Sequence, residues 1–184
     1  DLVIWMTGFE PSNTLTANDQ SYLSRYLYES HGKLWLIGQD AVSDLGYANA
    51  FLGAAFQLDP TTPYPLNVGT PDPILGRGIL NGTTMNFTDP FPGSLVNRGD
   101  FMRNTSRSAV AFQEQGGANR SLGLLFNATT NGSADTYMSS LFSFELTKIV
   151  SPNARSLMIY SMLEYDNMNA VYREYFPTEP PTRA

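Results

Sequence analysis

A short apolar run that ends at a glycine and two polar residues constrains the fold of this chain more than any other stretch. Residues 33–45 read KLWLIGQDAVSDL, so the apolar residues 34–37 are followed directly by Gly38, Gln39 and Asp40. This pattern predicts a buried strand, a sharp turn and a helix. In open α/β sheets, ligands bind outside the carboxyl ends of the strands, so these three residues stand where a site is expected.

The stretch before this strand predicts a parallel βαβ unit. Residues 1–8 (DLVIWMTG) form a near-continuous apolar run, which predicts a central strand buried on both faces. Thr16, with Asp19 three residues later, predicts the start of a helix that ends at Gly32. Two strands joined by a helix are expected to be parallel, with a right-handed crossover.

The rest of the chain predicts further strands and helices. Apolar spacing favours a helix over residues 41–52, a short strand over 54–58, an antiparallel hairpin of strands 108–113 and 122–127, and a strand over 137–146. Ser151 followed by Pro152 predicts the start of the longest helix. Its expected buried face consists of Ala154, Leu157, Met158, Ser161, Met162 and Tyr165. We therefore predict an α/β three-layer sandwich with a mainly parallel, flavodoxin-like sheet and a late antiparallel hairpin.

Length and composition restrict the domain organisation and the partners. A chain of 184 residues suits one α/β domain, which we place at residues 1–168, followed by a Pro/Thr-rich tail or linker at 169–184. The net charge of −6, with scattered basic residues, argues against a nucleic-acid partner. No apolar run reaches the roughly 18 residues that a membrane span needs, so no span is expected in this segment.

The cysteine and histidine content limits the chemistry. The chain has no cysteine, which excludes thiol nucleophiles, disulfides and cysteine-based zinc sites. The one histidine, His31, precedes Gly32 at the expected end of a helix, where we interpret it as a solvated residue. A Ser-His-Asp site would have to use that single imidazole. We expect neither a cofactor nor a metal site.

Asparagine sequons suggest the compartment. Six Asn-x-Ser/Thr motifs occur, where random placement would give roughly 2.4. The candidate N-glycosylation sites are Asn81, Asn86, Asn104, Asn119, Asn127 and Asn131. Either an Asn/Thr-rich surface generates these motifs incidentally, or they mark a glycosylated part of an exported protein. We favour export, with an extracellular or cell-surface location.

Three segments carry a family resemblance. Residues 1–40 combine a strand ending in Thr-Gly, an N-capped helix and a strand ending in Gly-Gln-Asp; residues 72–79 (DPILGRGI) and 141–165 (LFSFELTKIVSPNARSLMIYSMLEY) continue the pattern. Together they resemble the class I glutamine-amidotransferase-like (flavodoxin-like) domains, which occur as accessory modules in secreted peptidases and cell-surface proteins of bacteria and archaea. That family usually has a further strand and helix before the position of Asp1, so the resemblance implies a processed or excised segment.

The same resemblance implies that the family chemistry is lost. Catalytic members carry a Cys nucleophile on the turn that corresponds to Gly38 and Gln39, and a His-x-Glu pair that corresponds to Ser143 and Glu145. Covalent amide transfer needs an activated nucleophile and a base, and neither the thiol nor the imidazole is present. The resemblance therefore implies a non-catalytic structural or interaction module of an exported protein, whose partners are neighbouring domains or subunits.

Two other functions remain open. Asp40 and Glu145, the weak catalytic candidates, could serve a hydrolase without a thiol, with Gly38, Gln39, Asp40 and Ser143 lining a ligand pocket. The alternative interpretation is that Asp40 caps the following helix and Glu145 bonds nearby loop backbone. A third possibility is a carbohydrate-binding module, because the aromatic residues Tyr172, Tyr175 and Phe176 could stack on glycans.

Overall fold

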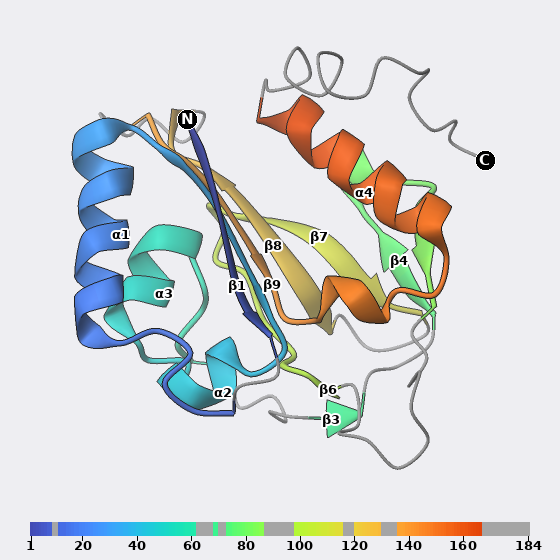
Figure 1. The fold of residues 1–184 in the computed structure, drawn as a ribbon, viewed down its shortest axis with the longest axis horizontal. Coiled ribbons are helices and arrows are strands. Elements are labelled where there is room, and N and C mark those ends of the chain that lie inside the picture. The colour runs from blue at the N-terminus through green and yellow to red at the C-terminus, as the bar shows by residue number, and fades with distance from the viewer. Residues whose placement is uncertain are drawn as a thin grey trace.

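The computed structural model describes residues 1–8, 11–61, 68–69, 73–86, 98–115, 120–129 and 136–166. Its main sheet has seven strands in the order β1-β2-β9-β8-β7-β4-β5 (Figure 1). Their bounds are β1 Leu2–Gly8, β2 Lys33–Gly38, β4 Ile74–Gly76, β5 Thr84–Met85, β7 Ala109–Glu114, β8 Ser121–Asn127 and β9 Met138–Phe142. A second sheet pairs β3 (Val68–Gly69) with β6 (Arg98–Gly99).

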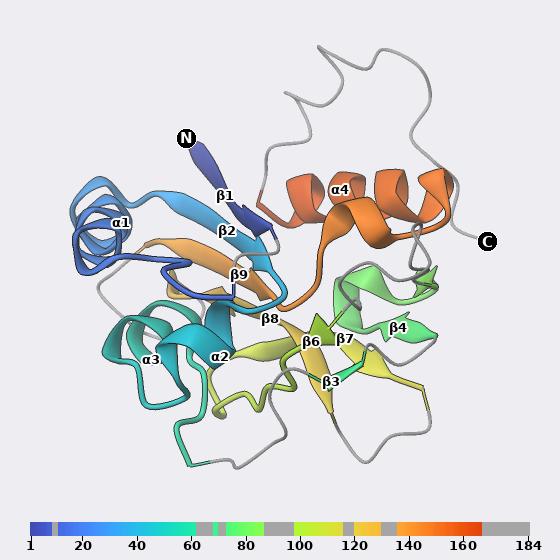
Figure 2. The ribbon, with the colours of Figure 1, turned by 60° about the horizontal axis from the view of Figure 1, so that its bottom comes forward.

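Helices cover both faces of the main sheet (Figures 1 and 2). On one side lie α1 (Ala17–Ser30), α2 (Ala41–Leu45) and α3 (Ala50–Phe56); on the other lies α4 (Pro152–Tyr165). The described residues also include the short 3-10 helices η1 (Gly78–Leu80) and η3 (Leu146–Lys148). A hydrophobic core lies on each face of the sheet, and alternate residues of β2 belong to different cores. Leu34 and Leu36 pack on the side of α1 and α3, whereas Trp35 and Ile37 pack on the side of α4.

The α/β class is confirmed, but the expectation of a mainly parallel sheet is wrong. Only the pairings β1·β2 and β2·β9 are parallel, whereas β9·β8, β8·β7, β7·β4 and β4·β5 are antiparallel. Parallel neighbours need a long crossover, which α1 supplies between β1 and β2. The segments that lead from β7 to β8 and from β8 to β9 are short, so those strands run antiparallel. The predicted hairpin is therefore confirmed, as β7 and β8.

The prediction that residues 1–8 form a central strand is also wrong. β1 is the edge strand of the sheet, and Ile4 and Met6 are each 49% exposed. A continuous apolar run is typical of a strand buried on both faces, but in β1 no side chain is fully buried and those of Ile4 and Met6 are half exposed. Val3 and Trp5 pack against the α1 and α3 core, and the opposite side chains remain half open.

Two local predictions about the second helix fail for identifiable reasons. Gly46 adopts a φ of +82° and ends α2, so residues 41–52 do not form one helix. Residues 54–58 belong mostly to α3 rather than to a strand, since Asn49 accepts a bond from the Leu52 amide and the segment is rich in alanine. Helix α4 begins at Ser151 and Pro152 as predicted, and Ala154, Leu157, Met158, Ser161 and Met162 are buried.

Candidate functional site

The carboxyl ends of the three parallel strands meet at one edge of the sheet. Met6 is paired with Ile37, and Ile37 with Phe142, so the residues that follow β2 and β9 leave the sheet on the same side. This places Gly38, Gln39 and Asp40 at the same edge as Ser143 and Glu145. We call this region the carboxyl edge.

Gly38 allows the ends of β1 and β2 to approach closely. A Cβ atom added at Gly38 would lie 1.7 Å from Oγ1 of Thr7, the residue at the end of β1. Oγ1 of Thr7 is itself buried and has no hydrogen-bond partner within the described residues. The glycine that looked like a turn signal in the sequence is therefore needed for packing between the two strand ends.

Asp100, which follows β6, fills the carboxyl edge from the side. The residue is fully buried, and its Oδ2 accepts a hydrogen bond of 2.7 Å from the Ser43 amide in α2. Its carbonyl oxygen accepts a hydrogen bond of 2.6 Å from Oγ of Ser143. Gly99 allows this approach, because a Cβ there would lie 2.6 Å from Leu122 and 3.1 Å from the Ser143 carbonyl oxygen. Asp100 thus connects the end of β9 to the start of α2, through its backbone carbonyl oxygen and its carboxylate.

Gln39 and Asp40 are buried beside this connection, with 3% of each residue exposed. Nε2 of Gln39 donates to Oδ2 of Asp40 at 3.2 Å. Asp40 is the N-cap residue of α2, as the alternative interpretation expects, but its side chain makes no capping bond. Its carbonyl oxygen instead accepts from Oγ of Ser43 at 3.0 Å and from the Asp44 amide at 2.9 Å.

Glu145 is the carboxylate at this edge with the clearest electrostatic perturbation. It is 3% exposed, and burial raises the pKa of its carboxyl group, against the opposing effects of hydrogen bonds from Thr147 and the charge of Lys148. Its Oε1 accepts from Oγ1 of Thr147 at 3.3 Å, while Oε2 has no partner within the described part of the chain. Within the described residues, no group of three or more Asp, Glu, His or Cys side chains is arranged to hold a metal ion.

A further buried carboxylate, Asp166, is not predicted by any pattern in the sequence. It directly follows α4 and accepts a bond of 2.5 Å from Nε1 of Trp35, while Nζ of Lys33 donates to its carbonyl oxygen at 2.5 Å. Burial raises the pKa of Asp166 to about 6, in spite of the Trp35 bond and the Lys33 charge. Alternation along β2 puts Lys33 and Trp35 on one face, but nothing in the sequence shows which acidic residue lies opposite.

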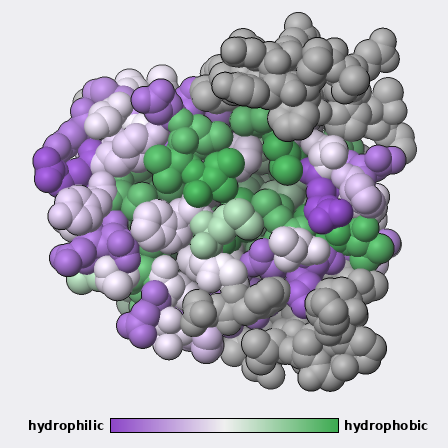
Figure 3. All heavy atoms as spheres, in the orientation of Figure 1, coloured by the Kyte–Doolittle hydropathy of each residue, from purple (hydrophilic) through white to green (hydrophobic). Residues whose placement is uncertain are grey.

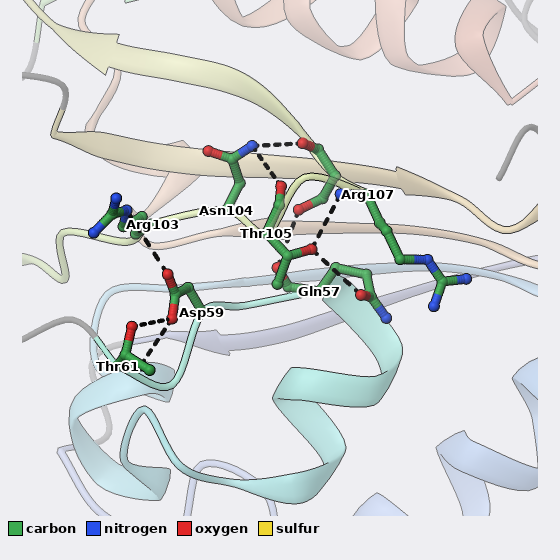
Figure 4. A network of polar contacts seen from close by, with 8 residues as sticks. Gln57, Asp59, Thr61, Arg103, Asn104, Thr105 and Arg107 are labelled. Carbon is green, nitrogen blue, oxygen red and sulfur yellow. Dashed lines mark hydrogen bonds and ion pairs between the residues drawn. The ribbon is translucent and has the colours of Figure 1, made fainter.

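The candidate glycosylation sites differ in their surroundings. Asn81 and Asn86 are exposed, Asn127 is half-buried, and Asn119 and Asn131 lie outside the described residues. Nδ2 of Asn104 donates to the carbonyl oxygens of Thr105 and Ser108 at 2.9 and 2.6 Å (Figure 4). A glycan on that nitrogen would have to replace at least one of these bonds.

The segment around Asn104 is fastened to the end of α3 (Figure 4). The Thr105 amide donates to the Gln57 carbonyl oxygen at 3.0 Å, and Arg103 lies 3.7 Å from the Asp59 carboxylate. Tyr172, Tyr175 and Phe176, the possible sugar-stacking residues, and the tail at 169–184 lie outside the described residues. His31 ends α1 in a left-handed conformation with a φ of 52° and is exposed.

Comparisons with known proteins find solved structures of similar fold but do not assign the chain to a family. No family model matches the sequence, and no curated protein matches it. One similar solved structure is the beta-galactosidase from Bacillus circulans sp. alkalophilus, at a TM-score of 0.52 and 13% identity over 90% of this chain. Another is the mmIFT52 N-terminal domain, at a TM-score of 0.51 and 13% identity over 90% of this chain and 76% of that one. The match spans only 22% of the beta-galactosidase chain. At this identity the likeness shows a shared fold alone.

Within the described residues, no helix has the length and apolar character needed to span a membrane.

Proposed function

We propose that this chain is a non-catalytic structural or interaction module of an exported protein, working through contacts with neighbouring domains or subunits. One observation carries the proposal: the carboxyl edge, where α/β domains place their ligands, is occupied by the chain itself. Asp100 is fully buried there, held by the Ser43 amide on one side and by the Ser143 hydroxyl on the other.

The likeness to solved structures supports a module within a longer polypeptide. The match takes up 22% of the beta-galactosidase chain and most of a structure that is named as an N-terminal domain. For this chain we propose the more specific assignment to the class I glutamine-amidotransferase-like accessory domains. Their nucleophile and His-x-Glu positions correspond here to Gly38 and Gln39 and to Ser143 and Glu145, none of which is Cys or His.

Export to the cell surface or the medium is part of the proposal. It is supported by the six sequons and by the exposure of Asn81 and Asn86. Cell fractionation tests it: the natural protein should be found in the extracellular or surface fraction, and recovery from the cytosol alone would contradict export. Glycan binding by the tail residues Tyr172, Tyr175 and Phe176 is a separate proposal, under which the chain is a carbohydrate-binding module.

A hydrolase that uses Glu145 is the second candidate, and a specific observation favours it. The carboxyl group is buried, its pKa is raised, and Oε2 has no partner among the described residues. A raised pKa suits a general acid. Against this candidate, Oδ2 of Asp40 already accepts a hydrogen bond of 3.2 Å from Nε2 of Gln39.

Replacing Asp100 tests whether the carboxyl edge has a structural or a catalytic role. If the carboxyl edge has a structural role, Asp100→Ala leaves the half-buried Ser43 amide without its acceptor and lowers the free energy of unfolding by about 2 kcal/mol. Residues that serve catalysis often lower the stability of the folded protein, so replacing them often raises it. An Asp100→Ala variant that is more stable than wild type would therefore contradict the structural role that we propose. Glu29→Ala is the control, because Glu29 is 63% exposed in a surface ion pair with Arg25 and should change stability by less than about 0.5 kcal/mol.

A further inference from the structure

On the side of β1 that faces away from β2, no strand of the described residues pairs with its backbone groups. The Lys33 amide donates to the Asp1 carbonyl oxygen at 3.2 Å, so odd-numbered residues of this strand direct their N–H and C=O groups toward β2. Backbone groups alternate in direction along a strand. The N–H and C=O groups of Leu2, Ile4 and Met6 therefore point away from the sheet.

Half-exposed apolar side chains flank these backbone groups. Ile4 and Met6 pair in register with Trp35 and Ile37, so all four side chains lie on the α4 face of the sheet. Trp35 and Ile37 are buried, whereas Ile4 and Met6 are each 49% exposed. Figure 3 shows an apolar area on this side of the molecule, over β1 and toward α4.

From Leu2 to Met6, β1 contains none of the sequence features with which proteins usually protect an edge strand. Such edges carry charged side chains, proline or a bulge, which discourage pairing with another strand. Leu2–Gly8 (LVIWMTG) contains no charged residue and no proline, and its one irregularity lies between Met6 and Gly8, at the carboxyl end. The stretch from Leu2 to Met6 is thus a regular, neutral and apolar template for a further strand.

We propose that the free edge of β1 is the docking site for one extended strand, uncharged and apolar at alternate positions, that a neighbouring segment of the same larger protein supplies. The inference rests on the proposed function, because it names the contact through which the module acts. Backbone hydrogen bonds to Leu2, Ile4 and Met6 supply the affinity, and alternate side chains of the docked strand cover Ile4 and Met6.

A tethered strand fits this edge better than a second copy of the chain does. A stable protein–protein interface buries about 800 Å² on each partner, whereas the apolar exposure at this edge comes from two half-exposed side chains. Two copies would each carry a net charge of −6 and repel each other at long range. Tethering raises the effective concentration of a strand, so a short edge suffices. In both similar structures the matched chain extends beyond the matched region, which fits a tethered partner.

Residue-resolved hydrogen exchange on the complete natural protein tests the inference. The amides of Val3 and Trp5 point toward β2 and serve as internal controls. Those of Ile4 and Met6 should exchange as slowly as the controls, on the order of 100-fold more slowly than free amides. Free exchange at Ile4 and Met6 beside protected Val3 and Trp5 would overturn the proposal. Protection that appears only together with a doubling of the molecular mass would also overturn it, because the occupant would then be a second copy.

These results separate the docking inference from the proposed function. Protected Ile4 and Met6 amides in a protein that proves to be a hydrolase would keep the docked strand and refute the non-catalytic role. Free amides together with a destabilised Asp100→Ala variant would keep the non-catalytic role and refute the docked strand.

Discussion

The carboxyl edge and the free edge of β1 belong to the same sheet but differ in how the chain treats their polar groups. At the carboxyl edge, the buried residues Asp100 and Ser143 are joined by a hydrogen bond, and Asp100 also accepts a bond from the Ser43 amide at the start of α2. At the free edge, the outward backbone groups of β1 have no strand beside them in the described chain, and Ile4 and Met6 are half exposed. The sequence predicts a ligand site at the carboxyl edge, but there the chain bonds to itself. It predicts no site at β1, yet within the described residues this strand lacks a neighbour on one side.

The largest expected effect on stability is at the carboxyl edge. Gly38→Ala would place a methyl group 1.7 Å from Oγ1 of Thr7, which forces the ends of β1 and β2 apart. Overpacking of this kind lowers the free energy of unfolding by about 3 kcal/mol. Thermal and urea unfolding would measure the loss.

The double variant Gly38→Ala/Thr7→Ala is the matched control for that prediction. Removing Oγ1 of Thr7 relieves the overlap, so the double variant should regain more than half of the lost stability. If the two substitutions were simply additive, the close approach at this edge would not be the cause.

The next effect concerns Asp166, which anchors the end of α4 to Trp35 and Lys33, near the amino end of β1. Its pKa is raised from 3.8 to about 6, so the folded state binds the proton more tightly than the unfolded state. The contribution of Asp166 to stability is therefore present below pH 3.8 and is lost as the pH rises through 6. Asp166→Asn removes this dependence, so between pH 4 and pH 7 its stability should rise relative to wild type by about 2 kcal/mol.

Chemical unfolding of wild type and Asp166→Asn at several pH values between 3.5 and 7.5 measures this difference. Glu164→Gln, on the preceding turn of α4, is the control for a loss of negative charge. A stability difference between wild type and Asp166→Asn that stays constant with pH would show that Asp166 titrates normally.

The smallest effect is expected at Glu145. Burial raises the pKa of this carboxyl group, so protonation favours the folded state and stability falls as the pH rises above the usual range of a glutamate. Glu145→Gln should change stability at pH 7 by no more than about 1 kcal/mol, since the bond with Thr147 is weak. Differential scanning calorimetry at pH 4 and pH 7 would detect it, and a large loss at both values would point to an essential structural bond instead.

The sequence predicts what local patterns determine. Thr16 and Asp19 form the capping box of α1, and Ser151 with Pro152 starts α4, because capping chemistry acts within a few residues. The hairpin β7–β8 is also a local feature, and its two apolar runs indicate it.

Tertiary neighbours decide what the sequence could not predict. An apolar strand such as β1 has the same appearance at the edge as in the centre of a sheet, and the direction of β8 and β9 depends on connections rather than on side chains. Asp100 and Asp166 meet partners 57 and 131 residues away, and no spacing rule joins such distant positions. The sequence predicts Glu145 at the carboxyl edge, but only the structure shows that its Oε2 has no partner among the described residues.

The contrast between the two edges is tested most directly by thermal unfolding of the complete natural protein with lysine placed on β1. The double variant Ile4→Lys/Met6→Lys is compared with Val150→Lys, because Val150 is equally exposed, at 49%, and lies outside the edge. If a strand covers β1, the double variant should lower the melting temperature by at least about 5 °C, while Val150→Lys changes it by about 1 °C or less. A double variant that melts within about 1 °C of Val150→Lys would show that the edge is uncovered and would contradict the account.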